Sequence, residues 1–312
     1  MEQKSFNKIL IVVVIAIGFY ASFLLISDSN VIYNKITTFK IIYLPLILSL
    51  VSVSWVVLFF RWTILLKKVN ISIPLMSSFV IYLSSFSLSA TPGQLGELIK
   101  SQLLKNKFNT PIAKTAPLVF IERLYDLTGA LIVSILGLWF LGIEIYIIII
   151  AFTCLTIIFL VLRSRTAFNK VLHLVKNIKF LSKFTTSLSE SYDTIHLSLH
   201  GKILFLSILF SVTYWVTIGI AAYFVLKAVG IDTISYAQAI SIYSASVILG
   251  GLSFIPGGIG VIEGSIAGLL TLNGIDISIA LVIGILIRIF TLWYGVLIGF
   301  IALKISGGLT NE

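Results

Sequence analysis

The stretch Phe254-Ile-Pro-Gly-Gly-Ile-Gly-Val-Ile-Glu263 decides the architecture of this chain, because a weaker copy occurs earlier at Ala90-Thr-Pro-Gly-Gln-Leu-Gly-Glu97. Each copy interrupts an apolar stretch with Pro-Gly, adds a further glycine and then presents a carboxylate. An arginine follows each break at nearly the same distance: Arg123 lies 31 residues after Pro92, and Arg288 lies 32 residues after Pro256. The sequence therefore contains an internal duplication.

The composition is that of a membrane protein. Of the 312 residues, 58% are hydrophobic and 11% are charged, whereas soluble domains carry about 25% charged residues. The single cysteine, Cys154, excludes an intramolecular disulfide and a cysteine metal cluster, and the three histidines show no metal-ligand spacing. We therefore expect no metal and no cofactor. The net charge of +10 fits basic residues at a membrane surface better than nucleic-acid binding.

We predict an all-α polytopic membrane protein that forms a single domain over residues 1–312, with six full spans. A span needs about 20 apolar residues, and two such stretches fall within residues 1–68. The other four spans are predicted at 115–141, 145–162, 203–226 and 277–303. Between them, residues 163–202 repeat apolar side chains every three or four positions with lysines in between, which predicts cytoplasmic amphipathic helices along the membrane surface. A small soluble domain is the weaker alternative for that segment.

Two stretches, residues 74–108 and 235–273, have arms too short or too polar to cross the bilayer, and each is interrupted by Pro-Gly. We predict that both are re-entrant hairpins, with breaks at Pro92 and Pro256. The first hairpin belongs to repeat 1 (residues 74–162), and the second belongs to the last segment (residues 203–306). Charge counting alone fits equally well with hairpins that cross completely as helix pairs.

The distribution of basic residues predicts the topology. With both termini in the cytoplasm, 17 of the 22 lysines and arginines fall on the cytoplasmic side, Arg61 and Lys100 among them, as the positive-inside rule requires. Three spans separate the starts of the two hairpins, so the hairpins enter from opposite sides and the repeat is inverted. Inverted repeats of this kind place a substrate site near the middle of the bilayer, and we expect the protein in the cell membrane.

The duplicated elements predict an anion site. A helix that begins after each break presents unpaired N–H groups, and glycines let a ligand approach the backbone. An arginine guanidinium matches a phosphate with its fork of donors. The predicted phosphate-binding residues are Arg123, Arg288, Gly93, Gly96, Gly257, Gly258 and Gly260.

Four acidic residues, Glu97, Glu122, Asp126 and Glu263, are expected to position the arginines or to receive a cationic headgroup. The alternative is that both arginines only pair with these carboxylates, because an isolated charge in lipid is costly. The second copy has Thr291 where the first has Asp126, so a structural role and a proton-linked role of Asp126 are equally compatible with the sequence.

Three ordered motifs resemble the lysylphosphatidylglycerol synthase transmembrane family: Ser89-Ala-Thr-Pro-Gly-Gln-Leu-Gly-Glu97, Ile121-Glu-Arg-Leu-Tyr-Asp126 and Pro256-Gly-Gly-Ile-Gly-Val-Ile-Glu263. The resemblance covers essentially the whole chain and points to the flippase-like domain of the multiple peptide resistance factors. In the large members, this domain moves aminoacylated phospholipid across the bilayer, and a soluble aminoacyltransferase domain makes the lipid. No such soluble domain is present up to Glu312, so the resemblance supports translocation and puts synthesis in doubt. Some stand-alone relatives work beside polyprenyl-linked sugar pathways.

The expected function is translocation of a phosphate-containing lipid headgroup, aminoacylated or polyprenyl-linked, by a protein that is not an enzyme. The first alternative is a secondary transporter of a small organic anion, which the same site would serve. A lipid-modifying enzyme of the phosphatidylglycerol lysyltransferase type ranks below both, because the sequence offers no nucleophile with a base and no nucleotide loop. The expected partners are membrane lipids, a separate lipid-modifying transferase and a second copy of the chain.

Overall fold

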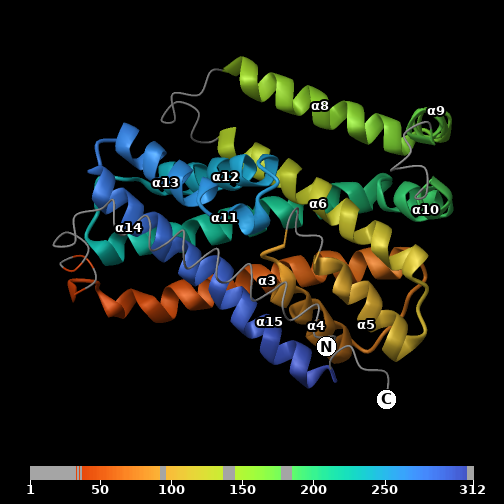
Figure 1. Cartoon of the computed structure of the whole chain (residues 1–312), viewed down its shortest axis with the longest axis horizontal. Helices are drawn as coiled ribbons and strands as arrows, with labels where there is room; N and C mark the ends of the chain where they lie inside the picture. Colours follow the sequence, from red (N-terminus) through yellow and green to blue (C-terminus); the bar gives the residue numbers. More distant parts are fainter. Residues whose placement is uncertain are drawn as a thin grey trace.

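The computed structural model describes residues 33, 35, 37–91, 96–135, 145–176 and 185–307. Within these ranges every regular element is a helix (Figure 1), which confirms the all-α class. The first predicted span, near the N-terminus, lies outside the described residues, as do Pro92 and Gly93 of the first break.

Three of the described helical segments are long and apolar enough to cross a membrane. The first is a short 3-10 turn, Ile41–Tyr43, continued by α3 (Leu44–Lys68). The second is α11 (Gly201–Val229), which packs along α3. The third joins α14 (Ile277–Arg288), a π-helical turn and α15 (Tyr294–Ile305). The chain is therefore a multi-pass membrane protein.

The middle of the chain supplies one charged helix and one bent pair. The charged helix, α6 (Ile112–Ile135), packs against α11 and α12 and carries Glu122, Arg123 and Asp126. The bent pair is α8 (Ile145–Arg163) and α9 (Arg165–Lys176), whose described parts meet at an angle of 102°. Figure 1 shows α8 along one edge of the molecule, with α9 and α10 (Thr185–Ser198) at its end. The predicted helices of the 163–202 segment are thus present in its described part, and their placement on a membrane surface stays a prediction.

Each duplicated segment consists of two short helices around a break. In the first, α4 (Leu75–Ser84) continues as a 3-10 turn, and α5 (Ile99–Phe108) follows the break. In the second, α12 (Tyr236–Leu252) and α13 (Val261–Leu272) flank a 3-10 turn at Pro256–Gly258. These helices have 10, 10, 17 and 12 residues, all shorter than the about 20 that a full crossing needs.

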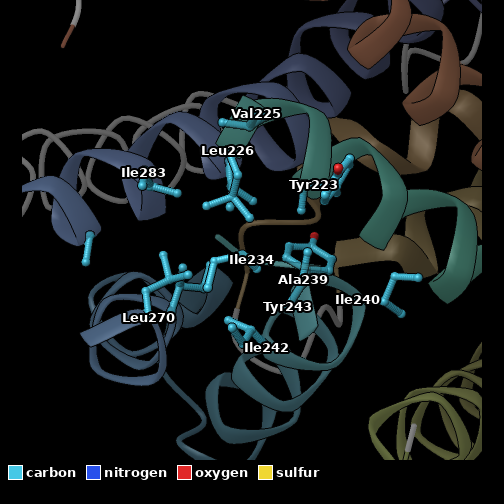
Figure 2. Packing of buried hydrophobic residues seen from close by; sticks show 14 of the residues in the cluster. Tyr223, Val225, Leu226, Ile234, Ala239, Ile240, Ile242, Tyr243, Leu270 and Ile283 are labelled. Atoms are coloured by element: carbon cyan, nitrogen blue, oxygen red, sulfur yellow. The ribbon is translucent and has the colours of Figure 1, made fainter. Parts of the chain in front are cut away.

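An apolar core holds the second segment against the long helices (Figure 2). Leu226 from α11, Tyr243 from α12 and Leu270 from α13 line one small cavity together with Ile287 of α14. Helix α12 packs on α11 and α13 packs on α14, so the helices on both sides of the second break are held by the long helices. This packing positions the second half of the site.

Candidate functional site

Six charged side chains form a closed ring of alternating sign in the interior of the molecule. Each cation contacts two carboxylates, and each carboxylate contacts two cations. The six nitrogen–oxygen distances, in order around the ring, are Arg61–Glu122 3.5 Å, Glu122–Lys100 2.5 Å, Lys100–Glu97 3.5 Å, Glu97–Arg123 3.1 Å, Arg123–Asp126 3.1 Å and Asp126–Arg61 2.5 Å. We call this set the charge ring.

Three parts of the chain build the charge ring. Helix α6 contributes three of its members, and the four-residue spacing of Glu122 and Asp126 places both carboxylates on one helix face. Arg61 comes from α3, while Glu97 and Lys100 come from the turn after the first break and from α5. The ring therefore ties the first duplicated segment to α3 and α6.

A fourth helix supports the ring from behind. Ser211 of α11 accepts a hydrogen bond from Arg61 Nη1 at 2.5 Å, and the indole of Trp215 donates to the backbone carbonyl of Asp126 at 2.8 Å. Helix α6 comes this close because Gly129 faces Ser211, where a Cβ atom would lie 2.7 Å from the serine Cβ. Close packing of α6 on α11 thus fixes the position of Asp126.

Burial differs sharply around the ring. The side chains of Arg61, Lys100 and Glu122 are 0% exposed, whereas that of Arg123 is 26% exposed. Three cations and three carboxylates give a formal charge of zero, so the ring offsets part of the large cost of burying each charge. Arg123 is the most exposed member of this neutral cluster.

Lys100 is held by aromatic rings as well as by carboxylates. Its ammonium lies 4.6 Å from the ring centre of Trp62 and 5.2 Å from that of Tyr82. An ammonium over an aromatic face is stabilised by the ring quadrupole, most strongly where water is excluded. The charge of the buried Lys100 is therefore stabilised by two aromatic rings and two carboxylates.

The second duplicated segment forms a smaller cluster. Arg288 Nε lies 3.1 Å from Glu263 Oε1, and its Nη2 donates to the backbone carbonyl of Gly257 in the second break. The other carboxylate oxygen of Glu263 accepts the N–H of Gly260 at 2.7 Å and so caps the N-terminus of α13. Arg288 is followed directly by the π-helical turn Ile289–Trp293, a distortion that is common at functional sites.

The two duplicated segments meet where Ala90, which precedes the first break, contacts the second break. Gly257 faces Ala90, and a Cβ atom at position 257 would lie 3.3 Å from the Ala90 Cα. Gly257 has a φ of 61°, and Gly258 has a φ of 63°. The backbone there is in the left-handed region that favours glycine. The second break thus needs glycine for its turn and for its contact with the first segment.

Two tyrosines link the charge ring to the Arg288 cluster. Tyr243 on α12 lies within electrostatic reach of Arg288. Tyr214 on α11 lies within reach of Tyr243 and also of Asp126 and Arg123. The electrostatic interactions of these two tyrosines thus extend to both arginines of the duplication.

The structure shows the ion pairs of the predicted charged residues. Arg123 contacts Glu97 and Asp126, and Arg288 contacts Glu263, so the pairing that the sequence left open is present. Glu122 contacts Arg61 and Lys100.

The glycine N–H groups that were predicted to bind phosphate have internal acceptors in at least three cases, and the N–H of Gly258 donates to the backbone carbonyl of Ile255 at 2.9 Å. The N–H of Gly96 donates to Thr91 Oγ1 at 2.7 Å, and that of Gly260 donates to Glu263. Phosphate binding by this set of residues stays a prediction, and a phosphate at Gly260 would have to displace the Glu263 carboxylate.

Charge counting did not predict the burial of two basic residues. It assigned Arg61 and Lys100 to the cytoplasmic side, which stays a prediction, and both side chains are fully buried among the carboxylates of the charge ring. The physical reason is that Glu122 and Asp126 on α6 need counterions, and α3 and α5 supply them. One signal was present in the sequence: Arg61 stands between Phe60 and Trp62 inside an apolar run, where a charge calls for a partner.

Comparisons with known proteins agree with the fold and with the motifs. The family model described as the lysylphosphatidylglycerol synthase TM region matches residues 9–299. The UPF0104 membrane protein PH1989 of Pyrococcus horikoshii is 23% identical over 289 residues, which cover 83% of this chain and 85% of that protein. The UPF0104 membrane protein MJ1078 of Methanocaldococcus jannaschii is 27% identical over 225 residues, covering 68% of this chain and 91% of that protein.

Proposed function

Because this chain belongs to the lysylphosphatidylglycerol synthase transmembrane family, we propose that it moves a phosphate-containing lipid headgroup across the membrane. The proposal includes a non-enzymatic mechanism, a location in the plasma membrane and cytoplasmic termini. Aminoacylated phospholipids and polyprenyl-linked lipids both carry the phosphate that such a site would bind. A separate transferase would then supply the lipid.

One observation carries the proposal: Arg123 is the only one of the six members of the charge ring with more than 10% of its side chain exposed. A guanidinium at the edge of a buried network presents a charged fork to a ligand while its own position is held by two carboxylates. Arg288 supports the same function from the second segment, beside a π-helical turn. Its contact with Gly257 places it at the break itself.

The proposed architecture is an inverted repeat of two re-entrant hairpins among six spans. The short arms of both segments and the contact of Gly257 with Ala90 support it. Broken helices that meet at the interface of two inverted repeats place a substrate near the middle of the bilayer. In this arrangement the phosphate passes between the two arginines while the acyl chains stay in lipid.

The experiment that tests this function uses the full chain in vesicles that contain a labelled phosphatidylglycerol, with chemical quenching of the outer-leaflet label. We expect the parent protein to move the label. Arg123→Lys and Arg288→Lys keep the charge without the fork and should retain part of the rate, whereas Arg123→Gln and Arg288→Gln should lose nearly all of it.

Arg165→Gln is the matched control, because Arg165 is exposed and its contacts, with Asp193 at 3.5 Å and with the ring of Tyr192 at 5.3 Å, lie outside the charge ring; it should transport at the parent rate. Folded Arg→Gln variants of Arg123 and Arg288 that transport at the parent rate would contradict the proposal. A protein that moves a small organic anion and no lipid would instead establish the secondary-transporter alternative.

A further inference from the structure

In the charge ring, Arg123 can move away from its two carboxylates while each of them keeps a second cation. When its guanidinium turns away, Asp126 keeps Arg61 at 2.5 Å and Glu97 keeps Lys100 at 3.5 Å. In an isolated buried ion pair there is no second counterion, so removing one partner leaves an uncompensated charge. Freeing Arg123 to bind a ligand should therefore cost less free energy in the closed ring than in an isolated ion pair.

We propose that anion binding opens the charge ring at Arg123 and that Glu97 takes up a proton in the same event. The proposal rests on the proposed function in one respect, namely that the anion is a phosphate diester. With Arg123 bound to a phosphate monoanion, the six ring charges and the ligand sum to minus one in a buried site. A proton taken from water onto the Glu97 carboxylate restores neutrality, and the ion pairs of Arg123 with Glu97 and with Asp126 are broken in the same event.

Glu97 is the acceptor because it is left with the weakest partner. Among the described residues, its remaining cation is Lys100 at 3.5 Å, and Lys100 is already held by Glu122 at 2.5 Å. Asp126 keeps the closer Arg61 and also faces Ser211, whose hydroxyl donates to it at 3.5 Å. Glu122 loses no partner at all. A low local dielectric makes these differences count.

The other ionisable groups around Glu97 do not replace Arg123. Within the described residues, the charged or titratable groups that face it are Lys100 of α5, Arg123 of α6, Tyr82 of α4 and Tyr214 of α11. Two of these are neutral phenols, and Lys100 is shared. Binding of the anion and uptake of the proton are therefore linked events, and each promotes the other. A lipid anion that crosses with one proton moves no net charge across the membrane.

The deciding experiment measures proton uptake on binding. The full chain in detergent, weakly buffered near neutral pH with an indicator dye, is titrated with short-chain phosphatidylglycerol. Its phosphodiester does not titrate near neutral pH, so any uptake comes from the protein. A parallel titration with dimethyl phosphate separates a lipid headgroup from a free phosphate diester. We expect about one proton taken up per bound lipid anion.

Two variants identify the acceptor. Glu97→Gln should bind the lipid with almost no proton uptake, whereas Glu97→Asp keeps a carboxylate and should keep the uptake. Asp232→Asn is the control, because Asp232 lies in a surface loop and pairs with Lys227; its uptake should equal that of the parent. Binding of both probes by the parent without proton uptake, or no binding of either probe, would overturn the inference. Uptake that persists in folded Glu97→Gln would also overturn it.

Vesicles with an imposed pH gradient separate this inference from the proposed function. Lipid movement that speeds up or slows down several-fold with the sign of the gradient supports both. Lipid movement that ignores the gradient, together with no uptake on binding, leaves the function standing and removes the coupling. Uptake on binding without any lipid movement supports the opening of the ring and contradicts lipid translocation.

Discussion

The guanidinium of Arg61 lies 2.5 Å from the carboxylate of Asp126 and joins α3 to α6 across 65 positions of the sequence. The same guanidinium reaches Glu122 one helical turn earlier. A single cation on α3 therefore holds both carboxylates of the α6 face. Both side chains are largely shielded from solvent. We therefore expect the contact to stabilise the fold as well as to serve the function.

Replacing Arg61 should destabilise the protein strongly. Arg61→Met removes one partner from two buried carboxylates, and breaking a buried pair in this way costs about 3–5 kcal/mol. Arg165→Met should cost about 0–1 kcal/mol, because its pair with Asp193 is exposed. The free energy of unfolding, measured for both variants in mixed detergent micelles, checks the difference. Equal stabilities of the two variants would show that the charge ring does not hold the fold together.

A side chain at position 257 should destabilise the protein. The φ of 61° at Gly257 and its contact with Ala90 both oppose a Cβ atom, so Gly257→Ala should lower the free energy of unfolding by about 1–2 kcal/mol. Gly264 on α13 is the matched control: a Cβ atom there meets nothing within 4 Å, and alanine in a helix is favoured over glycine by about 0.8–1 kcal/mol. Thermal unfolding of the two variants should move in opposite directions. A Gly257→Ala protein as stable as the parent would mean that Gly257 does not pack on Ala90 as described.

Much of this could be predicted from the sequence, because the deciding features are local. Pro-Gly fixes a break wherever it occurs in an apolar stretch, and the spacing of Glu122 and Asp126 fixes a shared helix face. The partners of those carboxylates could not be predicted, because Arg61 and Lys100 reach them through packing between helices that are distant in the sequence. Charge counting assigns each basic residue to one side of the membrane, and it contains no information on which of them a buried carboxylate attracts.

The topology should be visible by thiol labelling in intact cells. With Cys154→Ser as the background, Thr37→Cys and Thr166→Cys each place one thiol at an exposed position. An impermeant reagent should label position 37 and spare position 166, because the predicted cytoplasmic side includes the segment from residue 163 to 202. Labelling of both positions after permeabilisation is the control. The reverse pattern in intact cells would contradict the cytoplasmic placement of the termini.

Glu263 has two separable tasks, and two substitutions distinguish them. Glu263→Gln keeps an oxygen that can accept the Gly260 N–H, but it loses the charge that faces Arg288. Glu263→Ala loses both, so it should be less stable than Glu263→Gln by about 1 kcal/mol, the usual contribution of a helix cap. Unfolding in detergent micelles measures this order. Equal stabilities would show that the cap contributes little and that the ion pair dominates.

The charge ring also imposes an order on the biogenesis of the protein. As it leaves the ribosome, α6 carries Glu122, Arg123 and Asp126, and each such charge costs about 2.5–3.5 kcal/mol at the centre of an inserted helix. Its counterions on α3 and α5 precede it in the chain, so they are already synthesised when α6 enters the membrane. If α6 crosses the membrane as the sequence predicts, it enters the bilayer as the last member of the charge ring to be synthesised and not as an independent segment. A nascent chain that lost Arg61 or Lys100 would present the insertion machinery with a helix whose carboxylates lack a counterion. Cellular quality control would then degrade the protein before it could bind any lipid.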